Sequence, residues 1–148
     1  MPSHEDARLI LQLYDARREE TLRKARAWFA QHFHVTTLES LQALCPPGSD
    51  QNTYFRMVVT YWEMAASFVA SGVLNKELFF QSNQELLLVW SRVHGVVSEM
   101  RVAYRNPNSW KNLEAVGKAY IEYLEQTSPG AYAAFRERMG PPAAKRKS

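Results

Sequence analysis

The sequence is poor in cysteine, which limits how the chain can be stabilised. It has 148 residues and a single Cys. One cysteine cannot form an internal disulfide, and it cannot build a cysteine-rich zinc site. A chain of this length buries about 70% of the surface that its unfolded state exposes, so its core requires neither a disulfide nor a metal. We therefore expect a domain held together by apolar packing, with no cofactor and no bound metal.

Long apolar runs are also missing. The longest apolar stretches are short segments such as residues 86–90, whereas a membrane-spanning helix needs about 18 or more residues. The N-terminal residues lack the basic stretch, apolar run and small-residue cleavage site of a secretory signal. These features predict a soluble cytoplasmic protein without a membrane partner.

The body of the chain has no excess of basic residues. The net charge is +3, and the three residues Lys145, Arg146 and Lys147 account for it, because the 18 basic residues less these three equal the 15 acidic ones. Proteins that bind nucleic acid carry Lys and Arg on the folded surface, since neutralisation of phosphates supplies most of the non-specific affinity. The charge distribution predicts no nucleic-acid partner.

What the sequence does have is helical periodicity. Apolar residues recur every three to four positions in several segments, which Pro and Gly separate, and no segment shows the alternation typical of a strand. This pattern predicts an all-α, single-domain bundle of five or six helices over residues 1–139. Residues 140–148 lack a large apolar anchor and are expected to form a mobile basic tail.

The expected helices differ in character. The first is long, over about residues 3–31, with an exposed charged middle at 17–20, and a short second helix follows Thr37. A third begins with Asp50 as its cap and ends near residue 71; it is apolar over most of its circumference, which predicts a central position or a contact with a partner. A fourth covers residues 75–104, with a kink near 82–83, and Asn108 or Ser109 caps a fifth.

Four polar residues lie at the margins of the apolar stripes of the third and fourth helices: Arg56, Glu63, His94 and Arg101. If these helices pack side by side, the four side chains can converge on an anion-binding pocket, since arginine binds carboxylate and phosphate through two parallel hydrogen bonds. The alternative, which we favour, is a structural ion pair of Glu63 with Arg101 or Arg56.

The fourth predicted helix carries mostly small residues at heptad spacing on the face opposite its core stripe: Leu88, Ser91, Gly95, Ser98 and Val102. Small side chains allow another helix to approach closely. An exposed mid-helix glycine costs about 1 kcal/mol relative to alanine, so Gly95 is better explained if another helix crosses there. This seam therefore belongs to the centre of the domain or contacts a second subunit, and we predict a homodimer.

Signatures of common chemistries are absent. The sequence has no glycine-rich phosphate loop, no nucleophile elbow and no paired-histidine zinc motif. His32 and His34 are two positions apart, which on a helix places them on different sides and prevents them from sharing a metal ion. Cys45 precedes two prolines without an evident histidine partner, which indicates an inert thiol. The sequence does not predict an enzyme.

A set of motifs between Tyr61 and Leu124 carries a resemblance: Trp62-Glu63, Gly72-Val73-Leu74-Asn75-Lys76-Glu77-Leu78, Trp90, Arg101, and Asn106-Pro107 followed by Trp110. This stretch resembles a widespread bacterial family of small all-helical proteins of unknown function. The resemblance implies a helical fold and supplies no catalytic residues.

Two hypotheses about function follow from the sequence. The first is a non-enzymatic helical interaction module that self-associates. The second is a sensor of a small anionic ligand, with a pocket between the third and fourth helices. An enclosed cavity lined by polar residues favours the sensor, and an apolar seam on the outside favours the interaction module.

Overall fold

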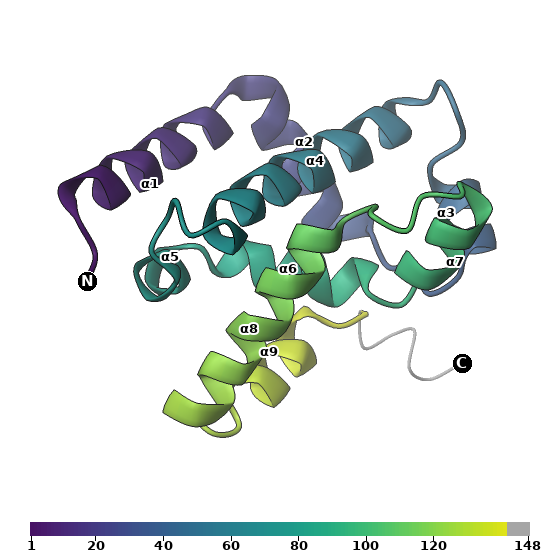
Figure 1. The fold of residues 1–148 in the computed structure, drawn as a ribbon. Helices are drawn as coiled ribbons and strands as arrows, with labels where there is room; N and C mark the ends of the chain where they lie inside the picture. Colours follow the sequence, from purple (N-terminus) through teal and green to yellow (C-terminus); the bar gives the residue numbers. More distant parts are fainter. Residues whose placement is uncertain (142–148) are drawn as a thin grey trace.

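All regular structure in the computed structural model, which describes residues 1–141, is helical (Figure 1). Over these residues the chain forms nine helices: α1 (His4–Arg17), α2 (Glu20–His32), α3 (Leu38–Leu44), α4 (Asp50–Ala70), α5 (Lys76–Ser82), α6 (Gln84–Val93), α7 (Val97–Ala103), α8 (Lys111–Thr127) and α9 (Ala131–Met139). The predicted all-α single domain is confirmed. The predicted number of five or six helices is wrong, because two of the expected long helices are divided.

Helix α4 lies at the centre of the bundle. It packs against α2, α6 and α8 (Figure 1). Its residues Trp62, Ala65 and Ala66 are completely buried. Ser49, rather than the expected Asp50, caps its N-terminus by accepting a hydrogen bond from the amide of Asn52. The central position predicted from the wide apolar surface of this helix is confirmed.

The expected long N-terminal helix is divided into α1 and α2 at Arg18 and Glu19. The Glu19 carboxylate accepts hydrogen bonds from the amides of Thr21 and Leu22, at 3.0 and 2.9 Å, and so caps α2. Capping by a side chain offsets the loss of intrahelical hydrogen bonds at a helix start. The expected exposure of the charged middle is wrong for Arg17, which is only 9% exposed.

The expected helix over residues 75–104 is divided into α5, α6 and α7. The predicted kink near 82–83 is confirmed as a break at Asn83, whose side-chain amide donates to the carbonyl of Phe79 at 3.0 Å. A second break, which the sequence did not indicate, lies between Val93 and Val97. Gly95 falls in this break, where a Cβ atom would lie 3.8 Å from the carbonyl oxygen of Thr36.

The C-terminal part of the described chain consists of α8 and α9. Helix α8 packs against α4, α6 and α9. Trp110 precedes α8 in the left-handed conformation, at φ 55°, and makes no side-chain cap. The expected cap at Asn108 or Ser109 is therefore wrong.

Within residues 1–141, no helix has both the length and the apolar character that crossing a membrane requires. The predicted tail begins at residue 140, and its residues 142–148 lie outside the described part of the chain.

Candidate functional site

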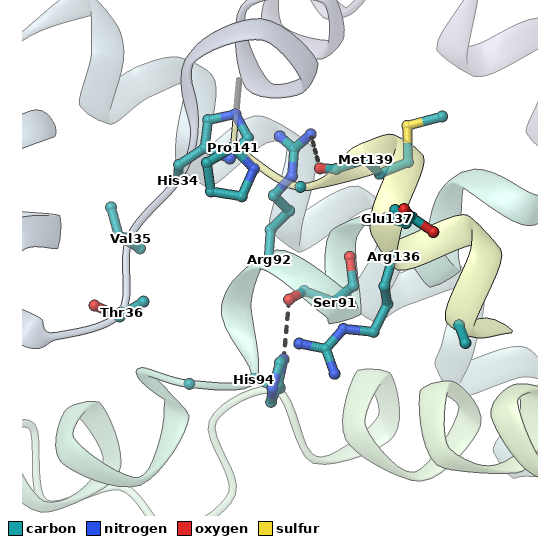
Figure 2. A pocket seen from close by; sticks show the side chains of 13 residues that line it. His34, Val35, Thr36, Ser91, Arg92, His94, Arg136, Glu137, Met139 and Pro141 are labelled. Atoms are coloured by element: carbon teal, nitrogen blue, oxygen red, sulfur yellow. Dashed lines mark hydrogen bonds between the residues drawn. The ribbon is translucent and has the colours of Figure 1, made fainter. Parts of the chain in front are cut away.

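A groove of about 600 Å³ lies where the segment between α2 and α3, the end of α6, and α9 meet (Figure 2). Its apolar lining includes Val35, Met139 and Pro141. Its charged and imidazole side chains come from all three segments: His34, Arg92, His94, Arg136 and Glu137. The groove thus brings together residues that are up to about a hundred positions apart in sequence.

Arg92 connects the C-terminal ends of two helices, α2 and α9, through hydrogen bonds beside this groove. Its Nη1 donates to the carbonyl oxygens of Phe29, Ala30 and Phe33 at 2.9, 3.0 and 3.1 Å. Its Nη2 donates to the carbonyl oxygen of Met139 at 3.0 Å (Figure 2). These carbonyls lie at the C-terminal ends of α2 and α9, where the helix dipole is negative. The Phe29 carbonyl also accepts a hydrogen bond from the amide of Phe33.

The charge of Arg92 has no carboxylate as an ion-pair partner within residues 1–141. No ion pair of Arg92 occurs among the described residues, and its buried Nε has no hydrogen-bond partner there. Burial lowers the pKa of the guanidinium, but arginine remains protonated in proteins. Arg92 therefore gives this side of the groove a fixed positive charge.

His94, the C-cap of α6, and Arg136 of α9 both line the groove. The Nδ1 atom of His94 lies 2.9 Å from the carbonyl oxygen of Ser91. A carbonyl only accepts hydrogen bonds, so Nδ1 carries the proton and Nε2 is left for another partner. Arg136 extends from α9 toward His94 and Ser91 (Figure 2), and its guanidinium carbon lies 6.0 Å from the ring centroid of Tyr132.

The electrostatics of the groove favour an anion. Two arginines and two histidines line it, against the single carboxylate of Glu137. His34 and Glu137 are already engaged in interactions. Arg136 therefore offers the donors best placed for a ligand, and the Nε2 atom of His94 becomes a second donor when the imidazole is protonated. No group of His, Cys, Asp or Glu side chains that could hold a metal ion occurs within residues 1–141.

The four residues predicted to form an anion pocket lie at three different places. His94 lines the groove, and Arg56 lines a second cavity between α3, α4 and α7. Glu63 and Arg101 both contact the N-terminal end of α8. The structure therefore does not bring the predicted four side chains together.

Glu63 serves as a cap for α8 although it belongs to α4. Its carboxylate accepts hydrogen bonds from the backbone amide of Leu113 at 2.8 Å, from the side-chain amide of Asn112 at 2.8 Å and from the backbone amide of Asn112 at 3.4 Å. A negative charge at a helix N-terminus also interacts favourably with the helix dipole. This contact replaces the local cap that Trp110 does not provide.

Arg101 fastens the loop before α8 to the first turn of that helix. Its Nε donates to the carbonyl of Ser109 at 2.9 Å, and its Nη1 pairs with Glu114 at 3.1 Å. Burial raises the pKa of Glu114, but the hydrogen bonds from Lys118 and Arg101 outweigh this effect and place the pKa below its ordinary value. The expected ion pair of Glu63 with Arg101 or Arg56 is not formed among the described residues.

The five residues of the predicted seam do not share one continuous helix. Leu88 and Ser91 belong to α6, Gly95 lies in the break, and Ser98 and Val102 belong to α7. Leu88 packs against the core, and Gly95 approaches the backbone of Thr36. Val102 is 80% exposed, so the part of the seam on α7 is open to a partner, and the homodimer stays a prediction.

Sequence reasoning missed a polar cluster where α1 and α2 meet α4 and α6. Arg26 binds both carboxylate oxygens of Glu85 at 2.8 Å, and the indole nitrogen of Trp62 donates to the same carboxylate at 3.2 Å. Beside them, the buried Arg17 donates to Asn83 at 3.1 Å. The partners of Arg26, Arg17 and Trp62 are 59, 66 and 23 residues away in sequence, and no local spacing could have indicated them.

Comparison with known proteins identifies the family. A family model described as a domain of unknown function (DUF4760) matches residues 2–137. No curated protein and no solved structure matches the chain. The predicted membership in a family of unknown function is confirmed, and the match extends well beyond residues 61–124. The chain belongs to the DUF4760 family, whose description states no function.

Proposed function

We propose that this protein is a non-enzymatic binding module that takes a small anionic ligand in the groove between α6, α9 and the segment after α2. The observation that carries this proposal is the lining of the groove, in which two arginines and two histidines face one carboxylate. Its volume of about 600 Å³ falls within the usual range of about 300 to 1,000 Å³ for small-molecule sites.

Each lining residue makes a different contact with the ligand. Arg136 offers a planar pair of donors that matches a carboxylate or phosphate. His94 Nε2 donates a second hydrogen bond when the imidazole is protonated. Arg92 uses its donors on backbone carbonyls and attracts the ligand through its positive charge. Val35 and Met139 contact the apolar part of the ligand. A ligand held in this way bridges three segments and therefore stabilises the folded state.

The test is calorimetric titration with inorganic phosphate and with citrate at low ionic strength. We expect saturable binding that weakens as salt is added, because counterions screen the charges. The Arg136→Ala variant should bind at least about tenfold more weakly, which corresponds to about 1.4 kcal/mol.

Arg138→Ala is the matched control, because Arg138 lies on the same helix but contacts the ring of Phe135 at 5.9 Å and does not line the groove. It should bind both anions as the wild type does. An equal loss of affinity in the two variants would show that the anion responds to the overall positive charge of α9 and not to the groove. Absence of binding by either anion would reject the groove as an anion site.

Self-association is the second candidate function. The observation that favours it is the 80% exposure of Val102, next to Ser98, on the outer part of the predicted seam. Light scattering should then give twice the chain mass of 17.1 kDa, and Val102→Asp should give a monomer. Val73→Asp is the control, since Val73 is 66% exposed and lies in the connection between α4 and α5. A wild-type monomer at every concentration rejects the homodimer.

The cytoplasmic location and the bacterial origin are proposals that rest on the sequence. The resemblance over residues 61–124 to a family of small helical bacterial proteins supports them. Fractionation of cells that express the untagged chain tests the location, and recovery in the membrane or periplasmic fraction would contradict it.

A further inference from the structure

A second cavity, of about 530 Å³, lies between α3, α4 and α7 and shares no lining residue with the groove. Its floor is apolar and buried, and consists of Leu41, Cys45, Phe55 and Met100. The Phe55 ring stacks on Phe33 at a centroid distance of 5.2 Å, and Phe33 is completely buried. The floor is therefore held by the core and presents a fixed apolar surface.

The polar lining residues of this cavity are Gln42, Asn52, Arg56 and Tyr104. Asn52 and Arg56 are four positions apart on α4, so their side chains lie on the same face one turn apart. The guanidinium of Arg56 and the side-chain amides of Gln42 and Asn52 form no hydrogen bond or ion pair with the described residues. The lining thus contains one cation, two amides with free hydrogen-bonding capacity, and no carboxylate.

We propose that this cavity binds a monocarboxylate with an apolar body, such as a medium-chain or aromatic acid. The apolar body lies on Phe55 and Met100, and burial of its surface contributes about 25 cal/mol per Å². The carboxylate accepts a pair of hydrogen bonds from Arg56 and a further one from the amide of Asn52. This site is independent of the anion groove, because neither its residues nor its apolar floor are shared with it.

The arrangement predicts selectivity in two directions. An alcohol of the same length keeps the apolar contact but loses the charge-assisted hydrogen bonds to Arg56. Acetate keeps the carboxylate but has almost no surface to bury. Binding that requires both the carboxylate and the apolar body distinguishes this cavity from a general anion site and from a general apolar surface.

Cys45 provides a reporter inside the cavity. It is the one cysteine of the chain and is 5% exposed. Burial raises the pKa of the Cys45 thiol to about 11, so alkylation near neutral pH is slow and sensitive to access. A ligand on the floor covers the thiol and slows its reaction further.

The experiment measures the rate of Cys45 alkylation by iodoacetamide, by mass spectrometry, with hexanoate as the probe. Hexanoate should slow alkylation at least threefold in a saturable manner, and 1-hexanol and acetate at the same concentration should have little effect. Arg56→Ala should abolish this protection. Arg23→Ala, a substitution of an exposed arginine on α2, should retain it.

Saturation-transfer NMR on hexanoate gives a second measurement that does not depend on the thiol. The signal should be strong with the wild type and with Arg23→Ala, and weak with Arg56→Ala. Circular dichroism first verifies that both variants are folded, which the exposed positions of both arginines favour. Absence of protection and of transfer, equal effects in the two variants, or equal protection by 1-hexanol would overturn the proposal.

Discussion

Gly117 on α8 lies directly against the indole of Trp90 on α6. A Cβ atom at position 117 would come within 2.5 Å of Trp90 Cγ and 2.6 Å of Cδ1. Trp90 is 5% exposed, so the ring has little room to move away. The absence of a side chain at Gly117 therefore permits the close packing of α6 against α8.

The first prediction concerns this contact. Gly117→Ala should lower the free energy of unfolding by about 1 to 3 kcal/mol, because overpacking displaces Trp90, even though alanine favours the helical conformation by about 1 kcal/mol. Urea denaturation measures the change. Gly95→Ala is the control: its Cβ would make an ordinary contact 3.8 Å from Thr36, and its stability should be unchanged or higher. Equal stabilities of the two variants would contradict the packing argument.

The second prediction concerns the cap of α8. Glu63→Ala removes the acceptor for the amides of Asn112 and Leu113 and should cost about 1 to 2 kcal/mol of unfolding free energy. Glu122→Ala, at an exposed position within α8, should have almost no effect. Amide hydrogen exchange should also become faster at residues 112 and 113 in Glu63→Ala. Unchanged exchange there would show that Glu63 does not cap the helix.

The third prediction separates the partners of Arg101. A double-mutant cycle with Arg101→Met and Glu114→Gln should give a coupling energy of about 0.5 to 1 kcal/mol, since the pair is partly exposed. The same cycle with Glu63→Gln should give a smaller coupling, because Glu63 binds Asn112 and Leu113 instead. A larger coupling energy of Arg101 with Glu63 than with Glu114 would support the ion pair expected from the sequence.

The fourth prediction concerns alkaline pH. Burial raises the pKa of Cys45 from 9.0 to about 11 and that of Tyr120 from 10.0 to about 12. In the unfolded chain the two groups lose their protons at the lower, ordinary pKa values. The stabilisation that the two buried, protonated groups contribute is therefore complete below pH 9 and is lost as the pH rises through 11 and 12.

Cys45→Ala isolates the thiol in this loss. Between pH 8 and pH 11 its unfolding free energy should fall by about 2 kcal/mol less than that of the wild type. Denaturant titrations at the two pH values measure the difference. Equal losses of unfolding free energy in the wild type and in Cys45→Ala would mean that folding does not raise the pKa of the thiol.

The fifth prediction concerns the basic C-terminal residues, which lie outside the described part of the chain. Their composition supplies no large apolar anchor, so deletion of residues 142–148 should leave the melting temperature almost unchanged. Differential scanning calorimetry measures it. A fall of several degrees would show that these residues contribute contacts to the fold.

The sequence by itself determined the helical class and the central helix, because both depend on local periodicity. The recurrence of apolar residues in α4 marks the surface that this helix buries, whichever neighbours cover it. The break before Pro46 and Pro47 was equally predictable, since proline removes a backbone donor wherever it stands.

Only the tertiary structure decided where the long helices divide and which polar groups meet. The break at Asn83 coincides with a contact to Arg17, 66 residues away, and the cap of α8 comes from Glu63, 50 residues before Leu113. The groove likewise joins segments that are distant in sequence. Apolar periodicity reports which face of a helix is buried, but it carries no information on which distant polar group will satisfy an exposed helix end. That pairing is fixed by the packing of the whole bundle.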